Sequence, residues 1–257
     1  MHRADRGADQ PRHLVRYDRG DALRGVGRPR ASAGGGTPPA SRLSPRAQIL
    51  DAAAELFTRH GVAATSTRAI ADRVGVRQAS LYHHFVNKDE MLVELLSGSV
   101  RPSLELVQRI EDRVPASASA AGALYALAVS DVATLAASPH NVGALYLSPE
   151  VQHGPYAAFR QQRHQLQAAY GRLGAACADH AAVPSRELAR IGAVLIQLAE
   201  LVIQLRRTGE ATEADADVIA AACLRACGLG GPRVALARQE SARLLGELQG
   251  HRVTPGR

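Results

Sequence analysis

Side chains that can read DNA are concentrated in one stretch of the chain, between Thr67 and Lys88. Gln78 can pair with adenine through two hydrogen bonds, Ser80 can donate to or accept from a base edge, and Ala79 can touch a thymine methyl group. Tyr82 and His84 are long enough to reach phosphates. This combination predicts contacts to both base edges and phosphates from one short segment.

Positive charge is concentrated in the same region. Between positions 59 and 88 a single acidic residue, Asp72, is opposed by five cations, namely Arg59, Arg68, Arg73, Arg77 and Lys88. A local excess of this kind attracts phosphate. Lys88 also lies near the start of an expected helix, where free backbone N–H groups further stabilise a phosphate. The charge pattern therefore favours a nucleic acid as the partner.

Three helices are expected to position these side chains. The first begins at Ser44, which is followed by a first-turn proline. The second is capped by Thr65 or Ser66 and ends at Gly75, and the third covers about residues 78–84. A longer helix followed by two short ones that meet at a glycine turn describes a helix-turn-helix unit.

The segment TRAIADRVGVRQASLYHHFVNKDEML, Thr67 to Leu92, closely resembles the second, third and early fourth helices of the tetracycline-repressor (TetR) family. The resemblance covers about residues 45–95, and it rests on pairs such as Gly75-Val76 and Leu81-Tyr82 at the family's spacing. It implies DNA contacts by eight residues, namely Thr67, Arg68, Gln78, Ala79, Ser80, Tyr82, His84 and Lys88.

Arg77 departs from the family pattern, which usually has a serine capping the third helix. An arginine cannot cap a helix, and the missing cap costs roughly 1 kcal/mol. Two interpretations stay open. Arg77 reaches a phosphate and joins the DNA-binding set, or it is a tolerated surface residue.

Prolines beyond Arg101, starting with Pro102, predict the limits of further helices, because proline begins a helix but disrupts its interior. The expected helices cover residues 103–114, 119–137, 140–148, 155–181, 185–207, 213–228 and 233–249. Strand-forming residues are few, and Ala, Leu, Arg, Gln and Glu dominate. We therefore expect an all-α fold, with an N-terminal three-helix helix-turn-helix DNA-binding domain and a C-terminal helical ligand-binding and dimerisation domain.

The expected domains are a disordered basic tail over residues 1–43, the DNA-binding domain over 44–100 and the helical body over 101–250. The tail carries nine arginines and four aspartates, and it includes the string Gly27-Arg28-Pro29-Arg30, with which many family members begin. An arginine in such an arm can enter the minor groove. Alternatively, the tail is inert or translation starts after it.

A dimer interface is expected on the last two helices of the body, because three-four spacing of apolar residues suits packing of helix against helix. The family forms its dimer from the corresponding helices. The residues assigned to this interface are Leu188, Ile191, Leu195, Leu198, Val202, Leu205, Ala222, Cys223 and Ala226. The alternative is that both helices pack only on their own body.

The resemblance also implies a ligand pocket among the helices from 103 to 181, apolar with few polar anchors. The residues assigned to it are Tyr125, His140, Asn141, Tyr146, His153, Tyr156 and Phe159. The histidines of this region lack metal-ligand spacing, so no metal site and no cofactor are expected.

The composition indicates the cellular compartment in which such a protein works. The three cysteines form no Cys-x-x-Cys pair, no uninterrupted apolar run reaches the ~18 residues of a membrane span, and the N-terminus lacks an apolar stretch. We expect a reduced, cytoplasmic protein that makes no membrane contact and joins the nucleoid when bound to DNA.

Together these features predict a ligand-responsive repressor that binds palindromic operator DNA as a homodimer and is released by a small, largely apolar effector. Two other classes remain as alternatives. An enzyme is disfavoured because no nucleophile-base pairing, phosphate loop or metal motif occurs. An activator or a DNA-bound structural regulator without a ligand would be favoured by a body with a closed, filled core.

Overall fold

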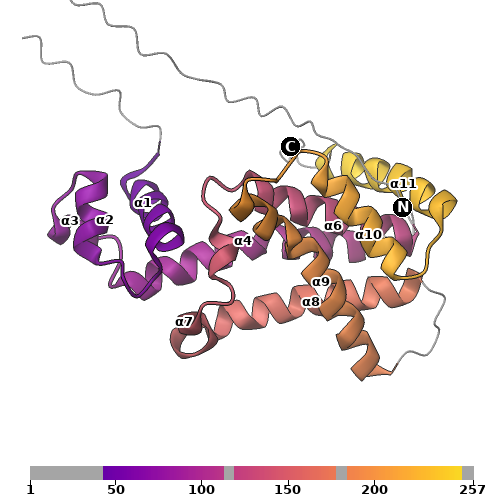
Figure 1. Ribbon diagram of the computed structural model, residues 1–257, viewed down its shortest axis with the longest axis horizontal. Helices are drawn as coiled ribbons and strands as arrows, with labels where there is room; N and C mark the ends of the chain where they lie inside the picture. The colour runs from indigo at the N-terminus through magenta and orange to yellow at the C-terminus, as the bar shows by residue number, and fades with distance from the viewer. Residues whose placement is uncertain (1–42, 113–118, 178–183, 251–257) are drawn as a thin grey trace, which may run out of the picture. The chain divides into compact units, whose positions relative to one another are not determined.

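The computed structural model describes residues 43–112, 119–177 and 184–250, and within these ranges all regular structure is helical (Figure 1). The predicted all-α fold is therefore confirmed for the described chain. The expected tail, apart from Leu43, lies outside these residues. By their contacts, the described residues belong to one compact unit.

The first three helices form the head, here defined as residues 44–87. Helix α1 (Pro45–His60) is capped by Ser44, whose side chain accepts a hydrogen bond from the backbone N–H of Ala47. Helix α2 (Thr67–Val74) is capped by Ser66, so the second of the two predicted caps is the one used. Gly75 follows with a φ of 82°, a left-handed conformation that suits glycine.

Helix α3 (Gln78–Tyr82) is shorter than predicted. Arg77 occupies its N-cap position without a side-chain hydrogen bond, as the sequence predicted. Leu81 of α3 is fully buried with Phe57 of α1, Ile70 of α2 and Phe85, and these side chains form the core of the head. Because Leu81 alone of α3 is buried, the other side chains of this helix are free to point outward.

Helix α4 (Lys88–Glu111) runs through Pro102, which corrects the prediction of two helices separated at that proline. Pro102 has no N–H for the carbonyl of Gly98, so the helix loses one hydrogen bond there. Buried residues on both sides of the proline, such as Leu96 and Leu106, offset this loss by packing. One continuous helix therefore joins the head to the body, and it crosses the predicted boundary at residue 100.

The body surrounds helix α6 (Ala120–Ala137), which is buried along most of its length. Helices α4, α8 (Ala157–Cys177), α9 (Ser185–Thr208), α10 (Asp215–Ala226) and α11 (Gly231–Gly250) pack against it or against one another. In Figure 1, α11 and α10 lie beside α6, as their contacts also indicate. The helix predicted over residues 233–249 is thus α11, and it packs on α6.

The expected helix over residues 140–148 is not present as a single element. Three short pieces replace it and the start of the next helix: η1 (Val142–Leu145), α7 (Pro149–Gln152) and η2 (Gly154–Tyr156). Proline at 149 and at 155 opens a new piece each time and prevents the preceding one from continuing. We call residues 138–156 the junction segment, because it contacts both the head and α4.

Helix α9 is held against α8 by an unusually close approach of the two backbones. A side chain at Gly192 would lie 2.2 Å from the carbonyl oxygen of Gln167, and one at Gly171 would lie 2.4 Å from that of Leu188. Both positions therefore require glycine. This contact determines which face of α9 turns inward.

Two helices, α6 and α9, are long and apolar enough to cross a membrane by length and composition alone. Helices of protein cores satisfy the same test. The buried share of the apolar window is 61% in α6 but only 33% in α9, so α9 leaves much apolar surface uncovered within one protomer.

Candidate nucleic-acid interface and pocket

Most of the residues predicted to contact DNA are exposed at the surface of the head. Gln78, Ala79 and Ser80 are exposed on α3, and the ring of Tyr82 is 49% exposed. Thr67, the first residue of α2, is half-buried beside them. His84 is also half-buried, just after α3.

A hydrogen-bonded cluster of three side chains joins the start of α2 to α3. The Gln78 amide donates to Thr67 Oγ1 at 2.9 Å and to Tyr82 Oη at 3.4 Å, and the two hydroxyl oxygens lie 3.2 Å apart. We call Thr67, Gln78 and Tyr82 the reading cluster. The contacts hold Gln78 in one orientation, while its side-chain carbonyl oxygen accepts no hydrogen bond from the described residues. This arrangement reduces the entropy lost on binding.

Most cations of the head already have anionic partners, which sequence reasoning did not find. The carboxylate of Glu55 in α1 forms ion pairs with Arg73, at 2.7 Å, and with Arg59, at 3.4 Å. Arg68 lies 3.9 Å from Asp72. The net positive charge of the predicted patch is therefore smaller than the local count implied. Arg77 is exposed and makes no ion pair with any residue that the structure describes, which leaves it available to a phosphate.

The ammonium group of Lys88, which the sequence analysis assigned to a phosphate, already has partners within the protein. Its ammonium group donates to the carbonyl oxygens of Val62 at 2.8 Å, Thr65 at 3.3 Å and Ala63 at 3.4 Å, and the residue is half-buried. These carbonyls belong to the loop between α1 and α2, more than twenty positions earlier in the chain. Lys88 thus holds that loop, and phosphate binding at this position stays a prediction.

The predicted dimer residues divide between the inside and the outside of the protomer. Leu195, Val202 and Cys223 are buried within it, so their assignment to the interface stays a prediction that this burial does not favour. Leu188, Ile191, Leu198, Leu205 and Ala222 are half-buried, and Ala226 is exposed. The close contact with α8 turns Leu195 and Val202 inward, and periodicity alone could not reveal this.

Large apolar side chains are instead exposed on α9 and α10 at positions that the sequence analysis did not select. Val194 is 55% exposed, Leu201 45% and Val218 61%. Val194 and Leu201 are seven residues apart and so lie on one face of α9. Contiguous exposed apolar surface is typical of protein–protein interfaces. The seven-residue spacing of Val194 and Leu201 could have revealed this face from the sequence. Gln197 and Gln204 lie on the same face, however, and made it appear polar.

The seven residues predicted to bind a ligand do not converge on one cavity. Tyr125 donates to Asp217 of α10 at 2.8 Å, the Asn141 amide to the carbonyl of Ile203 at 2.8 Å, and Tyr156 to Asp89 of α4 at 2.6 Å. Tyr146 and Phe159 do lie together in the core, with ring centroids 5.3 Å apart, whereas His153 is exposed. Most of the seven are thus committed to internal contacts, and their ligand role remains a prediction that this geometry does not favour.

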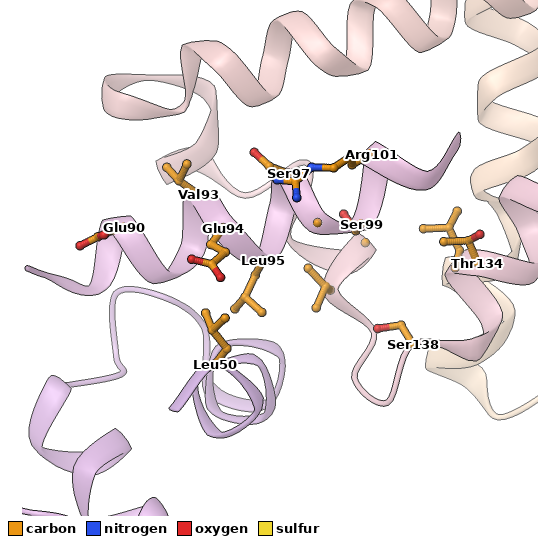
Figure 2. Close-up of a pocket in the computed structure, with 14 residues that line it drawn as sticks. Leu50, Glu90, Val93, Glu94, Leu95, Ser97, Ser99, Arg101, Thr134 and Ser138 are labelled. Atoms are coloured by element: carbon orange, nitrogen blue, oxygen red, sulfur yellow. The ribbon is translucent and has the colours of Figure 1, made fainter. Parts of the chain in front are cut away.

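A pocket of about 620 Å³ lies elsewhere, where the head meets the body (Figure 2). Its walls come from α1, from the first half of α4 up to Arg101, from the end of α6 and from η1. None of the seven predicted residues lines it. Sequence reasoning missed the pocket because its walls are distant in sequence.

A carboxylate is buried in the centre of the body. Asp131 of α6 is 3% exposed, and it accepts hydrogen bonds from Ser103 at 2.6 Å and from Tyr170 at 2.9 Å. Burial raises the pKa of Asp131 to about 6, although both hydrogen bonds act in the opposite direction. Within the described ranges, no group of three or more His, Cys, Asp or Glu side chains could hold a metal ion.

Comparison with known proteins identifies the head. Residues 49–95 match the family model described as bacterial regulatory proteins, tetR family. The chain is similar to the HTH-type transcriptional repressor KstR2 of Rhodococcus jostii, with 36% identity over 108 residues. It is also similar to KstR2 of Mycobacterium tuberculosis, with 49% identity over 55 residues. These matches span 42% and 21% of this chain, and only 50% and 28% of the relatives.

A solved structure extends the similarity to the body. Mycobacterium smegmatis AmtR is 41% identical and has a TM-score of 0.71, and the alignment covers 82% of this chain and 98% of that one. A gamma-butyrolactone receptor described as an ArpA-like protein shares the fold, with 21% identity and a TM-score of 0.55.

Proposed function

Because the chain belongs to the TetR family of bacterial regulatory proteins, we propose that it is a transcriptional repressor that binds palindromic operator DNA as a homodimer and is released by a small ligand. The observation that carries this proposal is the reading cluster on α3. Exposed Gln78 is held by Thr67 and Tyr82 on a helix that a single buried leucine attaches to the head. Repression, rather than activation, is supported by the similarity to two repressors.

Dimerisation is the second part of the proposal. Two heads must be linked for one protein to occupy two half-sites about one helical turn apart. The exposed apolar stripe of α9, with Val194 and Leu201, together with Val218 of α10, supports an interface built from these two helices. Such a protein works in the cytoplasm, on the nucleoid when bound to DNA.

Release by a ligand requires that the ligand prefer one shape of the protein. A molecule with equal affinity for the DNA-bound and the free shape would change nothing, however tightly it bound. The effector therefore has to contact parts of the chain that move relative to one another when the protein leaves the operator.

The test is binding of the pure protein to DNA from its own upstream region, by footprinting and fluorescence anisotropy. Gln78→Ala should cost roughly 1 to 3 kcal/mol on the operator, with little change on random DNA and relaxed preference at one symmetric pair of base positions. The matched control is Gln239→Ala, which removes an exposed glutamine from α11 and should change neither affinity.

Two results would contradict the proposal. Wild-type protein that protects no upstream sequence would remove the assignment as a local repressor. If Gln78→Ala instead lowered operator and random-DNA affinity equally, or lowered the thermal midpoint of the head, the base-reading role of α3 would be wrong.

A further inference from the structure

The pocket between head and body is lined by residues of both. Leu50 of α1 supplies the head wall, while Val142 and Gly143 of η1 and the end of α6 supply the body wall. In the view of Figure 2, Leu50 lies below α4, Arg101 lies above it, and Thr134 and Ser138 lie beyond Ser99 toward the end of α6. An occupant would touch the head, the connecting helix and the body at once.

Contacts beside this pocket hold the head and the first half of α4 to the junction segment. His140 Nε2 lies 3.0 Å from Asp51 Oδ1, next to Leu50 on α1, and Tyr156 donates to Asp89 at the start of α4. Ser99 and Tyr146 share a hydrogen bond of 2.8 Å within the same region. The pocket therefore lies inside the set of contacts that orients the head.

The α4 wall carries two features that a buried helix normally lacks. Pro102 cannot donate to the carbonyl of Gly98, so the helix is weakened at the pocket. Gly98 itself costs about 1 kcal/mol in a helix interior relative to alanine. A side chain at Gly98 would meet no atom within 4 Å, so the glycine is not needed for packing inside the protomer.

The side chains of the pocket indicate the chemistry of its occupant. Its two acids are already used, because Glu94 pairs with Arg46 and Glu90 accepts the backbone N–H of Val86 at 2.6 Å. Arg101 makes no ion pair with a described residue, so it is the charge left for a ligand. Apolar residues, which include Leu95 and Leu135, make up much of the remaining wall. A carboxylate with an apolar tail matches this arrangement.

We propose that this junction pocket is the effector site, that it takes an amphipathic carboxylate with its anion at Arg101, and that its occupancy weakens operator binding. The inference rests on the proposed repressor function and places the ligand at residues other than the seven that the sequence indicated. An occupant fills the space between α1 and η1 and fixes the head against the body. The two heads can then no longer move relative to their bodies, and this movement is what lets both fit successive major grooves.

The experiment fills the pocket by substitution. Gly98→Phe places a ring in the open space, whereas Gly98→Ala removes the glycine without filling it. Gly246→Phe is the matched control, because Gly246 is an exposed glycine inside α11 that also has no atom within 4 Å of a side chain. Gly98→Phe should lower operator affinity about tenfold or more, and the other two variants should bind as wild type.

The ligand class is tested with octanoate, with octanol as the neutral analogue. Octanoate should raise the thermal midpoint of wild-type protein and of Gly98→Ala, but not of Gly98→Phe or Arg101→Gln. Octanol should have little effect. Arg243→Gln, which removes an exposed arginine from α11, should respond to octanoate as wild type does.

The outcomes separate this inference from the proposed function. If wild type binds its operator and Gly98→Phe binds equally well or more tightly, the junction pocket does not release DNA and the inference falls alone. If octanoate stabilises no variant, or stabilises all of them equally, the carboxylate assignment falls. If octanoate binds in the expected pattern but wild type has no operator, the site stands and the repressor proposal falls.

Discussion

At the scale of single residues, the head contains cations with opposite tasks. Lys88 donates to three backbone carbonyls of the loop between α1 and α2, whereas Arg77 is exposed at the N-cap of α3 without an ion pair among the described residues. Both would have been counted together as phosphate ligands from charge alone. The contacts indicate that one stabilises the fold and that the other is free to meet DNA.

We predict that Lys88→Ala lowers the thermal midpoint, because it removes three hydrogen bonds that hold the loop between α1 and α2, at a cost of about 1 to 3 kcal/mol. Arg77→Ala removes the same charge and should leave the midpoint unchanged while reducing the salt dependence of DNA binding by about 1 per subunit. Thermal unfolding and salt titrations of operator binding distinguish the two. Equal midpoints for both variants would refute the structural role of Lys88.

Asp131 makes the stability of the body depend on pH. Its folded pKa of about 6 lies above the ordinary value of 3.8, so the folded state binds the proton more tightly than the unfolded state does. The resulting stabilisation is fully present below about pH 4 and is lost as the pH rises through 6. The loss is on the order of 2 to 3 kcal/mol.

Asp131→Asn should remove this contribution to the pH dependence, and urea unfolding at pH 4.5 and 7.5 measures it. An amide nitrogen cannot accept from Tyr170 but can donate to its hydroxyl oxygen, so the variant reverses this hydrogen bond at every pH. The informative quantity is therefore the difference in the free energy of unfolding between pH 4.5 and pH 7.5, compared with the same difference in wild type. An unchanged difference would show that Asp131 is ionised in the folded state as readily as in the unfolded one.

At the scale of elements, α9 is both a core helix and a surface helix. Leu195 and Val202 pack inward, and Val194 and Leu201 point outward. Charged substitutions at Val202 would damage the protomer itself, so they cannot test dimerisation cleanly. Substitutions at the exposed pair, Val194 and Leu201, can test it.

Val194→Glu with Leu201→Glu should yield a folded monomer of about 27.2 kDa that has lost operator binding, because each buried like charge disfavours an apolar interface. Light scattering at micromolar concentration and circular dichroism measure mass and helicity. Leu236→Glu on α11, where the leucine is 52% exposed, is the matched control and should remain dimeric. A double variant that stays dimeric would place the interface elsewhere.

At the scale of the whole molecule, the chain carries a basic segment before the head. Residues 1–43 hold nine arginines and four aspartates. Their removal should leave the thermal midpoint unchanged and reduce operator affinity modestly, chiefly at low salt, because their charge acts through counterion release. Anisotropy titrations at two salt concentrations provide the measurement. Complete loss of operator binding on truncation would make the segment part of the base-reading surface.

The sequence by itself determined the head and the fold class. Ser44, Ser66 and Gly75 act on backbone groups within a few positions of themselves, so local residue types sufficed to locate the ends of α1 and α2. The same locality made the exposed residues of α3 predictable, since its one large apolar residue had to be the buried one. The resemblance to a family then supplied the remaining expectations.

Only the tertiary structure decided the orientation of α9, the task of Lys88 and the position of the pocket. Periodicity identifies an apolar face but not the neighbour that covers it, and the glycine contact with α8 settles that for α9. Lys88 meets carbonyls more than twenty positions away, and the pocket joins Leu50, Gly98 and Gly143. Such contacts depend on how whole helices pack, and no short stretch of the chain encodes them.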